Sequence, residues 1–204
     1  MMNKKVRILQ TINLFRLIPI WIIINMQSVD RRKLIFEEIE HWNKCVQLNL
    51  KGKFNIFSVL ILKLKEYRSL LYYRCGGGGK ILIKIFFPPM ESLYINTREI
   101  GPRFFIQHGF ATNISAKSIG SDCWVNQQVT IGYTFDKEPP VIGNGVRISA
   151  GAKVLGNIKV DNNVIVAANA VVIKNVEKNM IVGGVPAKII GTNVNYKLWS
   201  ENND

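Results

Sequence analysis

The sequence predicts a mainly β protein: a left-handed parallel β-helix preceded by a helical N-terminal region. The main observation is a six-residue period in the C-terminal half, where an aliphatic residue recurs every six positions and a small or aliphatic residue follows each by four. The first set is Ile142, Ile148, Val154, Val160, Val166 and Val172, and the second is Val146, Ala152, Ile158, Val164, Ala170 and Val176. This period matches neither a 3.6-residue helix nor an alternating strand, but it is typical of short strands joined by tight corners in a triangular coil.

The same period predicts where the β-helix begins, breaks and ends. Ile119, Val125 and Ile131 continue it upstream, and eleven residues rather than six then separate Ile131 from Ile142. We therefore expect residues 133–140 to leave the coil as a loop. The β-helix domain is expected over residues 93–192, with an irregular first coil, and residues 193–204 form a polar tail.

The first part of the chain has helical periodicity. Residues 1–75 are predicted to be a helical region, partly apolar and basic, because apolar residues such as Phe57, Leu60, Ile61 and Leu64 recur at spacings of three and four. Four glycines at 76–79 and the pair Pro88-Pro89 predict a linker over 76–92. A phosphate-binding loop is excluded there, because Ile81 rather than Ser or Thr follows Lys80.

Charge and composition limit the partners. The net charge is +13, mostly from the first half of the chain, yet no nucleic-acid-binding signature accompanies it, so we expect no nucleic-acid partner. An anionic cofactor or a membrane surface explains the charge as well as nucleic acid does, and a solvated basic surface is the favoured explanation. The apolar run at 17–24 is interrupted by Asn13 and Arg16 and is far shorter than the roughly 20 residues that span a bilayer. It predicts a buried or interfacial segment and leaves peripheral membrane contact open.

The cysteines predict a reducing compartment and no metal site. Cys45, Cys75 and Cys123 are odd in number and scattered, without the spacing of metal ligands. A cytoplasmic location, with membrane association through the N-terminus as an option, is the natural expectation.

Only one of the two histidines is a candidate for catalysis. His41 lies in a charged helical stretch and is expected to be exposed without a partner, whereas His108 lies on the first coil in the segment 104–109. An imidazole whose pKa is near neutrality is suited to removing a proton from a hydroxyl group. From the residues alone, a structural histidine at a coil corner is the favoured interpretation.

Residues 66–191 resemble the serine O-acetyltransferase branch of the hexapeptide-repeat acyltransferases. The matching segments are Glu66–Arg74, Gln107–Gly109, Val129–Gly132, Ile148–Ile158 and Gly184–Lys188. The resemblance implies that His108 is the general base and that backbone N–H groups near Gly132 support the oxyanion. It also implies direct transfer of acetyl from acetyl-CoA to a hydroxyl, without an acyl-enzyme. The positions that it implies for coenzyme A are Ala150, Ala168, Lys174 and Lys188.

The chain departs from that family where the acceptor is bound. Gln107 stands where an acidic residue is usual, and Lys137-Glu-Pro-Pro140 replaces a histidine-containing stretch; Glu91 and Glu99 are the candidates to orient the base. Two acceptors therefore stay open: L-serine, in cysteine biosynthesis, and a sugar hydroxyl, in surface polysaccharide biosynthesis.

Two further expectations concern the assembly and the alternative to catalysis. A non-catalytic β-helix scaffold is less favoured, because it needs neither His108 nor the loop. The resemblance implies that coenzyme A lies in a groove shared between coils of two subunits, and such a groove implies a homotrimer or a dimer of trimers.

Overall fold

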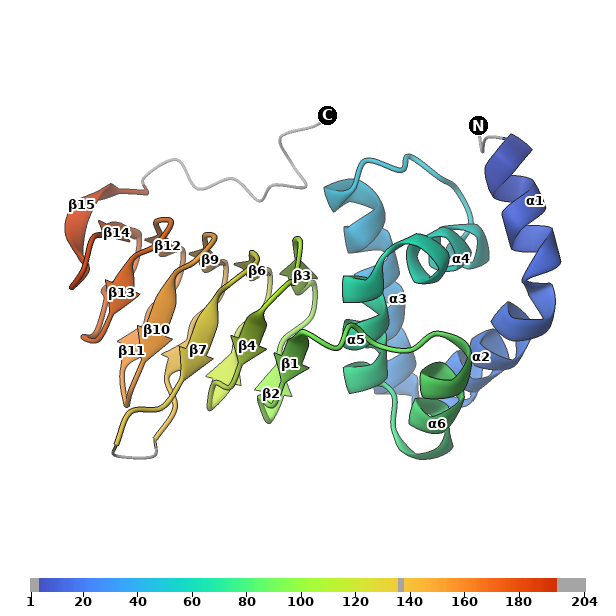
Figure 1. Cartoon of the computed structure of the whole chain (residues 1–204), viewed down its shortest axis with the longest axis horizontal. Helices are drawn as coiled ribbons and strands as arrows, with labels where there is room; N and C mark the ends of the chain where they lie inside the picture. The colour runs from blue at the N-terminus through green and yellow to red at the C-terminus, as the bar shows by residue number, and fades with distance from the viewer. Residues whose placement is uncertain (1–3, 136–137, 194–204) are drawn as a thin grey trace. The chain divides into compact units, whose positions relative to one another are not determined.

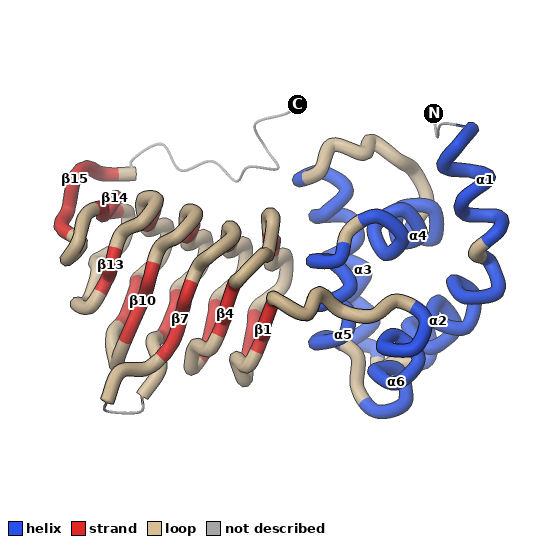
Figure 2. The backbone as a smooth tube through the Cα atoms, viewed as in Figure 1, coloured by secondary structure: helices blue, strands red, loops and turns tan. Residues whose placement is uncertain are grey.

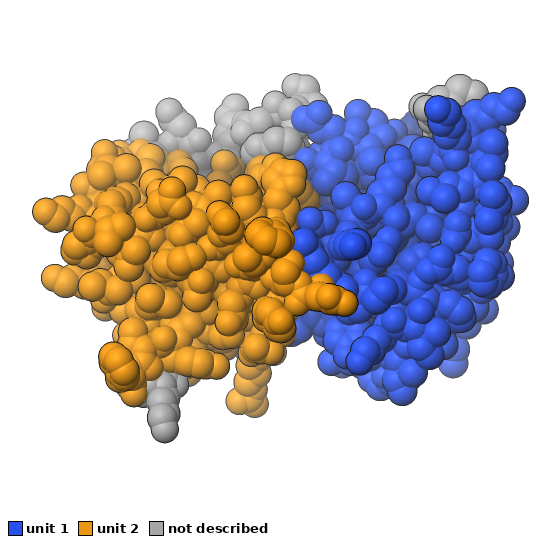
Figure 3. All heavy atoms as spheres, viewed as in Figure 1, with its two compact units in different colours: residues 1–90 blue, residues 91–204 orange. Residues whose placement is uncertain are grey.

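The computed structural model describes residues 4–135 and 138–193 and divides into two compact units, Met1–Met90 and Glu91–Asp204 (Figure 3). The polar tail predicted from residue 193 lies outside the described residues except for Asn193.

The first unit is helical. It consists of α1 (Lys4–Ile12), α2 (Leu14–Met26), α3 (Val29–Cys45), α4 (Lys53–Lys63), α5 (Lys65–Arg74) and α6 (Gly77–Phe86) (Figure 1). Trp42 of α3 and Tyr67 of α5 are buried and meet edge to face, with ring centroids 5.3 Å apart. A buried ion pair joins the same two helices, where Arg74 Nη2 lies 2.5 Å from Glu38 Oε1.

The linker predicted at 76–92 is wrong over most of its length, because residues 77–86 form helix α6. Ile83 is fully buried, and a Cβ atom on Gly79 would come within 2.9 Å of Ile23 Cγ2 in α2. The glycines that lower the intrinsic helix propensity therefore also allow α6 to lie close against α2, and this packing overrides the propensity.

His41, which the sequence predicts to be exposed and without a partner, differs from that expectation in both respects. It is half-buried, and its Nε2 lies 3.3 Å from Cys45 Sγ, one helical turn further along α3.

Among the described residues, no single helix is both long enough and apolar enough to span a membrane. Helices α1 and α2 reach the required length and hydropathy only as a pair, and they are bent by 78° at their junction.

The second unit confirms the predicted fold class, a parallel β-helix of three sheets (Figure 2). The first sheet contains β1 (Leu93–Ile95), β4 (Thr112–Ile114), β7 (Thr130–Gly132), β10 (Lys153–Leu155) and β13 (Val171–Val172). The second contains β2 (Glu99–Ile100), β5 (Ser118–Ile119), β8 (Val141–Ile142) and β11 (Lys159–Val160). The third contains β3 (Phe105–Ile106), β6 (Trp124–Val125), β9 (Arg147–Ile148), β12 (Ile165–Val166), β14 (Met180–Gly183) and β15 (Lys188–Thr192). All pairs are parallel except β14 with β15.

The six-residue period corresponds to the register of the sheets. Ile148 pairs with Val166 and Val154 with Val172, each 18 residues apart, so three hexads make one coil. The aliphatic positions stack inside the coil and are buried. Ile119 pairs with Ile142, 23 residues away, which confirms that the extra residues leave the coil as a loop.

Three corners between the second and third sheets leave no room for a side chain and hold Gly101, Gly120 and Gly143, whereas Asp161 follows the last strand of the second sheet. A Cβ atom on Gly120 would lie 2.7 Å from backbone atoms of both Gly143 and Asn144 in the next coil. Side chains at these positions would force the coils apart.

Candidate active site

The corner that joins the third sheet to the first, here called the His108 corner, is a regular column of stacked residues. The backbone N–H groups of Gln128, Gly151 and Asn169 donate hydrogen bonds to the carbonyls of Phe110, Gln127 and Ala150, at 2.8, 3.0 and 2.9 Å. The column therefore runs through Phe110, Gln127, Ala150 and Ala168, one residue from each coil.

His108 sits in a two-residue bulge on this corner. Ile106 pairs with Val125, and Ile114 pairs with Ile131. Ile106 and Ile114 are eight positions apart in their coil, whereas Val125 and Ile131 are only six apart in the next coil. Because Phe110 stacks on Gln127, the two additional residues are His108 and Gly109. His108 is exposed and has a φ of 56°, a left-handed conformation that it shares with Ala111 and Gln128 on the same corner.

The groups beside His108 are amides and one carboxylate. Gln107 Oε1 accepts a hydrogen bond from Asn126 Nδ2 of the next coil at 3.1 Å. Leu93 pairs with Thr112, which places Glu91 in register with Phe110 and therefore on the His108 corner. Glu99 lies in β2 of the second sheet and is not on this corner. Within the described residues, neither glutamate forms an ion pair with His108.

Gly132 lies at the other edge of the first sheet, as the last residue of β7. The structure does not bring it together with His108 within one chain. Its carbonyl accepts a hydrogen bond from the N–H of Gly156 at 2.9 Å, and a Cβ atom added to it would meet no atom within 4 Å. Packing within the chain therefore does not explain why this residue is glycine.

The predicted coenzyme A positions divide between two corners. Ala150 and Ala168 belong to the His108 column, and Val166 pairs with Val182, which puts Gly184 in register with Ala168. Lys188 pairs with Gly183 and is exposed at the end of the same column. Lys174 follows β13 and lies at the corner between the first and second sheets, away from the other three.

The loop at 133–140 also leaves from the corner between the first and second sheets. In Figure 1 the β7–β8 connection lies along the lower edge and the β3–β4 connection, which carries the His108 bulge, along the upper edge. The loop and His108 therefore do not flank one groove within a single chain. Phe135 on the loop is 105% exposed, and Lys137 lies outside the described residues.

Sequence reasoning missed Lys153 as a cation of the His108 corner. Its Nζ donates a hydrogen bond to the carbonyl of Gln128 at 2.5 Å, which brings the ammonium from β10 to the column. Phe110, 57% exposed, adds an apolar side chain beside the bulge. The six-residue period predicts that Lys153 points outward. It does not predict which carbonyl group the ammonium binds, and that contact sets the direction of the long side chain.

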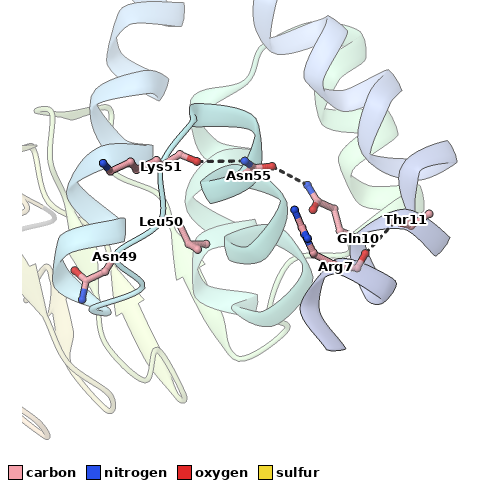
Figure 4. A pocket seen from close by; sticks show the side chains of 7 residues that line it. All are labelled: Arg7, Gln10, Thr11, Asn49, Leu50, Lys51 and Asn55. Atoms are coloured by element: carbon pink, nitrogen blue, oxygen red, sulfur yellow. Dashed lines mark hydrogen bonds between the residues drawn. The ribbon is translucent and has the colours of Figure 1, made fainter. Parts of the chain in front are cut away.

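A hollow lies in the helical unit, between α1 and the segment that leads into α4 (Figure 4). It has a volume of about 550 Å³ and is lined by Arg7, Gln10, Thr11, Asn49, Leu50, Lys51 and Asn55. A hydrogen bond of 3.3 Å from Gln10 Nε2 to Asn55 Oδ1 crosses it. Its lining holds two cations and no acid, and none of the predicted catalytic residues.

Comparison with known proteins agrees with this geometry. The family model described as bacterial transferase hexapeptide (six repeats) matches residues 139–174. Serine acetyltransferase of Staphylococcus aureus (strain Mu50) is 44% identical over 96 residues, 45% of this chain and 45% of that protein. The predicted resemblance is confirmed. The match to these curated serine acetyltransferases spans less than half of their length.

Solved serine acetyltransferases share the fold. The crystal structure of the Vibrio cholerae serine acetyltransferase superposes with a TM-score of 0.61 and 26% identity, over 85% of this chain and 70% of that one. A serine acetyltransferase solved in complex with CoA has a TM-score of 0.53 and 24% identity, over 78% of this chain and 69% of that one, and at that identity it shows the fold alone.

Proposed function

We propose that this protein is an acetyl-CoA-dependent O-acetyltransferase of the serine acetyltransferase type, with L-serine as acceptor. The observation that carries the proposal is the two-residue bulge that presents His108 on the same corner as the small residues Ala150 and Ala168. The similarity to serine acetyltransferases supports the choice of reaction and acceptor.

In the proposed reaction the His108 imidazole accepts the proton of the acceptor hydroxyl while that oxygen attacks the thioester carbonyl carbon. The carbon–sulfur bond then breaks, and the departing coenzyme A sulfur receives the proton from the imidazolium. Backbone N–H groups near Gly132 support the negative charge on the carbonyl oxygen.

Direct transfer is favoured because two of the three cysteines, Cys75 and Cys123, are poor nucleophiles. Burial raises the pKa of the Cys123 thiol to about 12 and that of Cys75 to about 11, so both stay protonated at neutral pH. All three cysteines are buried and none forms a disulfide, which supports the expected cytoplasmic setting.

Coenzyme A is proposed to lie along the His108 column. The small side chains of Ala150 and Ala168 allow its pantetheine arm to approach the backbone, and Lys188 and Lys153 provide cations for phosphate groups. Lys174, on the other corner, reaches the same cofactor only from a neighbouring subunit. The serine acetyltransferase solved with CoA supports this choice of donor.

The same geometry favours a homotrimer. His108 and Gly132 lie on opposite edges of the first sheet, so one acetyl group meets both only if they come from different copies. Phe135, fully exposed on the loop, is an apolar side chain that a second copy would cover. A dimer of trimers joined through the helical units is the further option.

One observation favours a sugar hydroxyl as the alternative acceptor. Beside His108 the chain presents the hydrogen-bonded amides of Gln107 and Asn126 instead of an acid. Amides pair well with neutral hydroxyl groups, whereas the ammonium of serine needs a carboxylate, for which Glu91 is the candidate on this corner.

The experiment that tests the proposal is release of free coenzyme A from acetyl-CoA by the purified full chain, with L-serine compared with nucleotide sugars and short glycans. Turnover with serine that is lost in His108→Ala supports the proposal. Turnover with a sugar alone selects the alternative, and no turnover with any acceptor would indicate a scaffold.

A further inference from the structure

Helices α1 and α2 expose a row of large apolar side chains that packing within the helical unit leaves uncovered. The residues are Ile8, Leu9, Ile12, Phe15, Ile18, Ile22 and Met26, with exposed fractions from 40% for Leu9 to 77% for Met26. We call this set the α1–α2 face. Single exposed apolar residues are common, but a continuous row of seven is typical of an interaction surface.

The row follows the geometry of α2 closely. Phe15, Ile18, Ile22 and Met26 are spaced by three, four and four residues and therefore lie on one side of the helix. Leu17, Ile20 and Ile24, on the opposite side, are all 0% exposed. The helix thus fills the core of the unit with one side and carries a second apolar side into solvent.

The charge around the face has one sign. Residues 4–26 contain Lys4, Lys5, Arg7 and Arg16 and no Asp or Glu. Lys4 lies one turn before Ile8 and two turns before Ile12 on the same row of α1. The whole segment 1–90 has 16 Lys and Arg against five Asp and Glu, a net charge of +11 out of +13 for the chain.

Helix α6 repeats the same combination. It packs against α2, exposes Ile81 and Ile85 at 63% and 65%, and carries Lys80 and Lys84 without an acid.

We propose that the α1–α2 face docks on the surface of an anionic lipid bilayer. Apolar side chains between cationic ones match the boundary between lipid chains and negatively charged headgroups. With 9 and 13 residues and a 78° bend between them, the two helices measure about 14 and 20 Å, each shorter than the ~30 Å hydrocarbon layer. They therefore lie in the interface and do not cross it.

A second copy of the chain fits the face less well. In a symmetric dimer the same patch meets itself, so Lys4, Lys5 and Arg7 of one copy would approach the same cations of the other. Residues 4–26 offer no carboxylate to compensate them. An anionic membrane supplies that negative charge.

The hollow beside α1 extends the basic surface. Arg7 precedes Ile8 by one position, about 100° around the helix, and lines the hollow together with Lys51. A headgroup phosphate at the edge of the docked face would meet both cations there.

The test is sedimentation of the full chain with vesicles of phosphatidylcholine alone and of phosphatidylcholine with 30 mol% phosphatidylglycerol, at low and at high salt. We expect the chain to bind the anionic vesicles at least about tenfold more tightly than the neutral vesicles. We also expect its binding to the anionic vesicles to weaken at high salt. Equal binding to both kinds of vesicle, or no binding to either, would overturn the proposal.

Two pairs of variants locate the surface. Lys4→Glu/Lys5→Glu should lower binding at least about tenfold, whereas Lys63→Glu/Lys65→Glu, an identical change of charge at exposed positions of α4 and α5, should leave it nearly unchanged. Phe15→Ser/Ile22→Ser should also lose binding, whereas Tyr94→Ser, an exposed aromatic of β1, should not. Equal losses in both charge variants would mean a nonspecific attraction and contradict the proposal.

The oligomeric state separates membrane docking from self-association. Light scattering of Phe15→Ser/Ile22→Ser without lipid should give the same mass as the original chain, and a smaller mass would show that a second copy occupies the face. Acetyl transfer measured on the same samples keeps this inference separate from the proposed function, on which it does not depend.

Discussion

The carbonyl of Phe110 accepts a hydrogen bond of 2.8 Å from the backbone N–H of Gln128, one coil further along the β-helix. This contact closes the corner and leaves His108 and Gly109 outside the stacked column. The bulge is therefore a local insertion whose flanks are held by the regular ladder, on the corner that also carries Ala150 and Ala168.

Replacing the proposed base should abolish most of the activity. His108→Ala is expected to lower turnover by at least ~100-fold while acetyl-CoA affinity stays nearly the same, because the lost group acts on the proton and not on the cofactor. Steady-state kinetics and calorimetric titration measure the two effects. His41→Ala, the change at the only other histidine, should keep turnover, and an active His108→Ala variant would contradict the assignment.

Two glycines should respond differently to the same substitution. Gly132→Ala should leave the unfolding temperature nearly unchanged, since a Cβ there meets no atom within 4 Å, but it should lower turnover because the methyl occupies the space of the acetyl group. Gly120→Ala should destabilise the fold by roughly 2 kcal/mol or more, because its Cβ would lie 2.7 Å from neighbouring backbone. Thermal unfolding and turnover of both variants check this, and unchanged turnover in Gly132→Ala would remove it from the site.

Filling the column should weaken cofactor binding. Ala168→Trp is expected to raise the KM for acetyl-CoA about tenfold or more with a smaller effect on the acceptor, because the indole occupies the path of the pantetheine arm. Glu177→Trp, exposed at a corner between the second and third sheets, is the matched control and should leave the KM unchanged. The same rise in both variants would argue against a site on the His108 corner.

The buried ion pair of the helical unit should contribute strongly to stability. Glu38→Gln is expected to lower the free energy of unfolding by about 3–5 kcal/mol, because Arg74 would keep its buried charge without its carboxylate. Lys117→Ala, which removes an exposed partner 3.9 Å from Glu138, should cost less than about 1 kcal/mol. Denaturant unfolding of the two variants compares them, and a small loss in Glu38→Gln would contradict the importance of the pair.

Stability should fall at high pH because of Cys123. Burial raises the pKa of its thiol from 9.0 to about 12, so the folded state holds the proton more tightly than the unfolded chain. The contribution is fully present below pH 9 and is lost as the pH rises from about 9 to about 12. Unfolding curves across this range should be flatter for Cys123→Ala than for the original chain. Rapid reaction of the native protein with a thiol reagent at pH 8 would show that the thiol is accessible.

Much of the β-helix follows from the sequence because its period is local. A hexad places one inward aliphatic residue on each side of the coil, and Ile148, Val154 and Val160 therefore predict three strands without knowledge of any contact. The gap of eleven residues after Ile131 predicts the loop for the same reason. Helix α6 escapes such reasoning, since its glycines oppose a helix in isolation and only the contact of Gly79 with Ile23 shows why one forms.

The sequence by itself determined the β-helix, the position of its loop, the resemblance to serine acetyltransferases and the choice of His108. Only the tertiary structure decided that His108 lies on a bulge, that Ala150 and Ala168 share its corner, and that Gly132 and Lys174 do not. The physical reason is that the corner on which a residue lies depends on the number of residues that each coil has between one sheet and the next. That number becomes visible only when hydrogen bonds such as the one from Gln128 to Phe110 align one coil with the next.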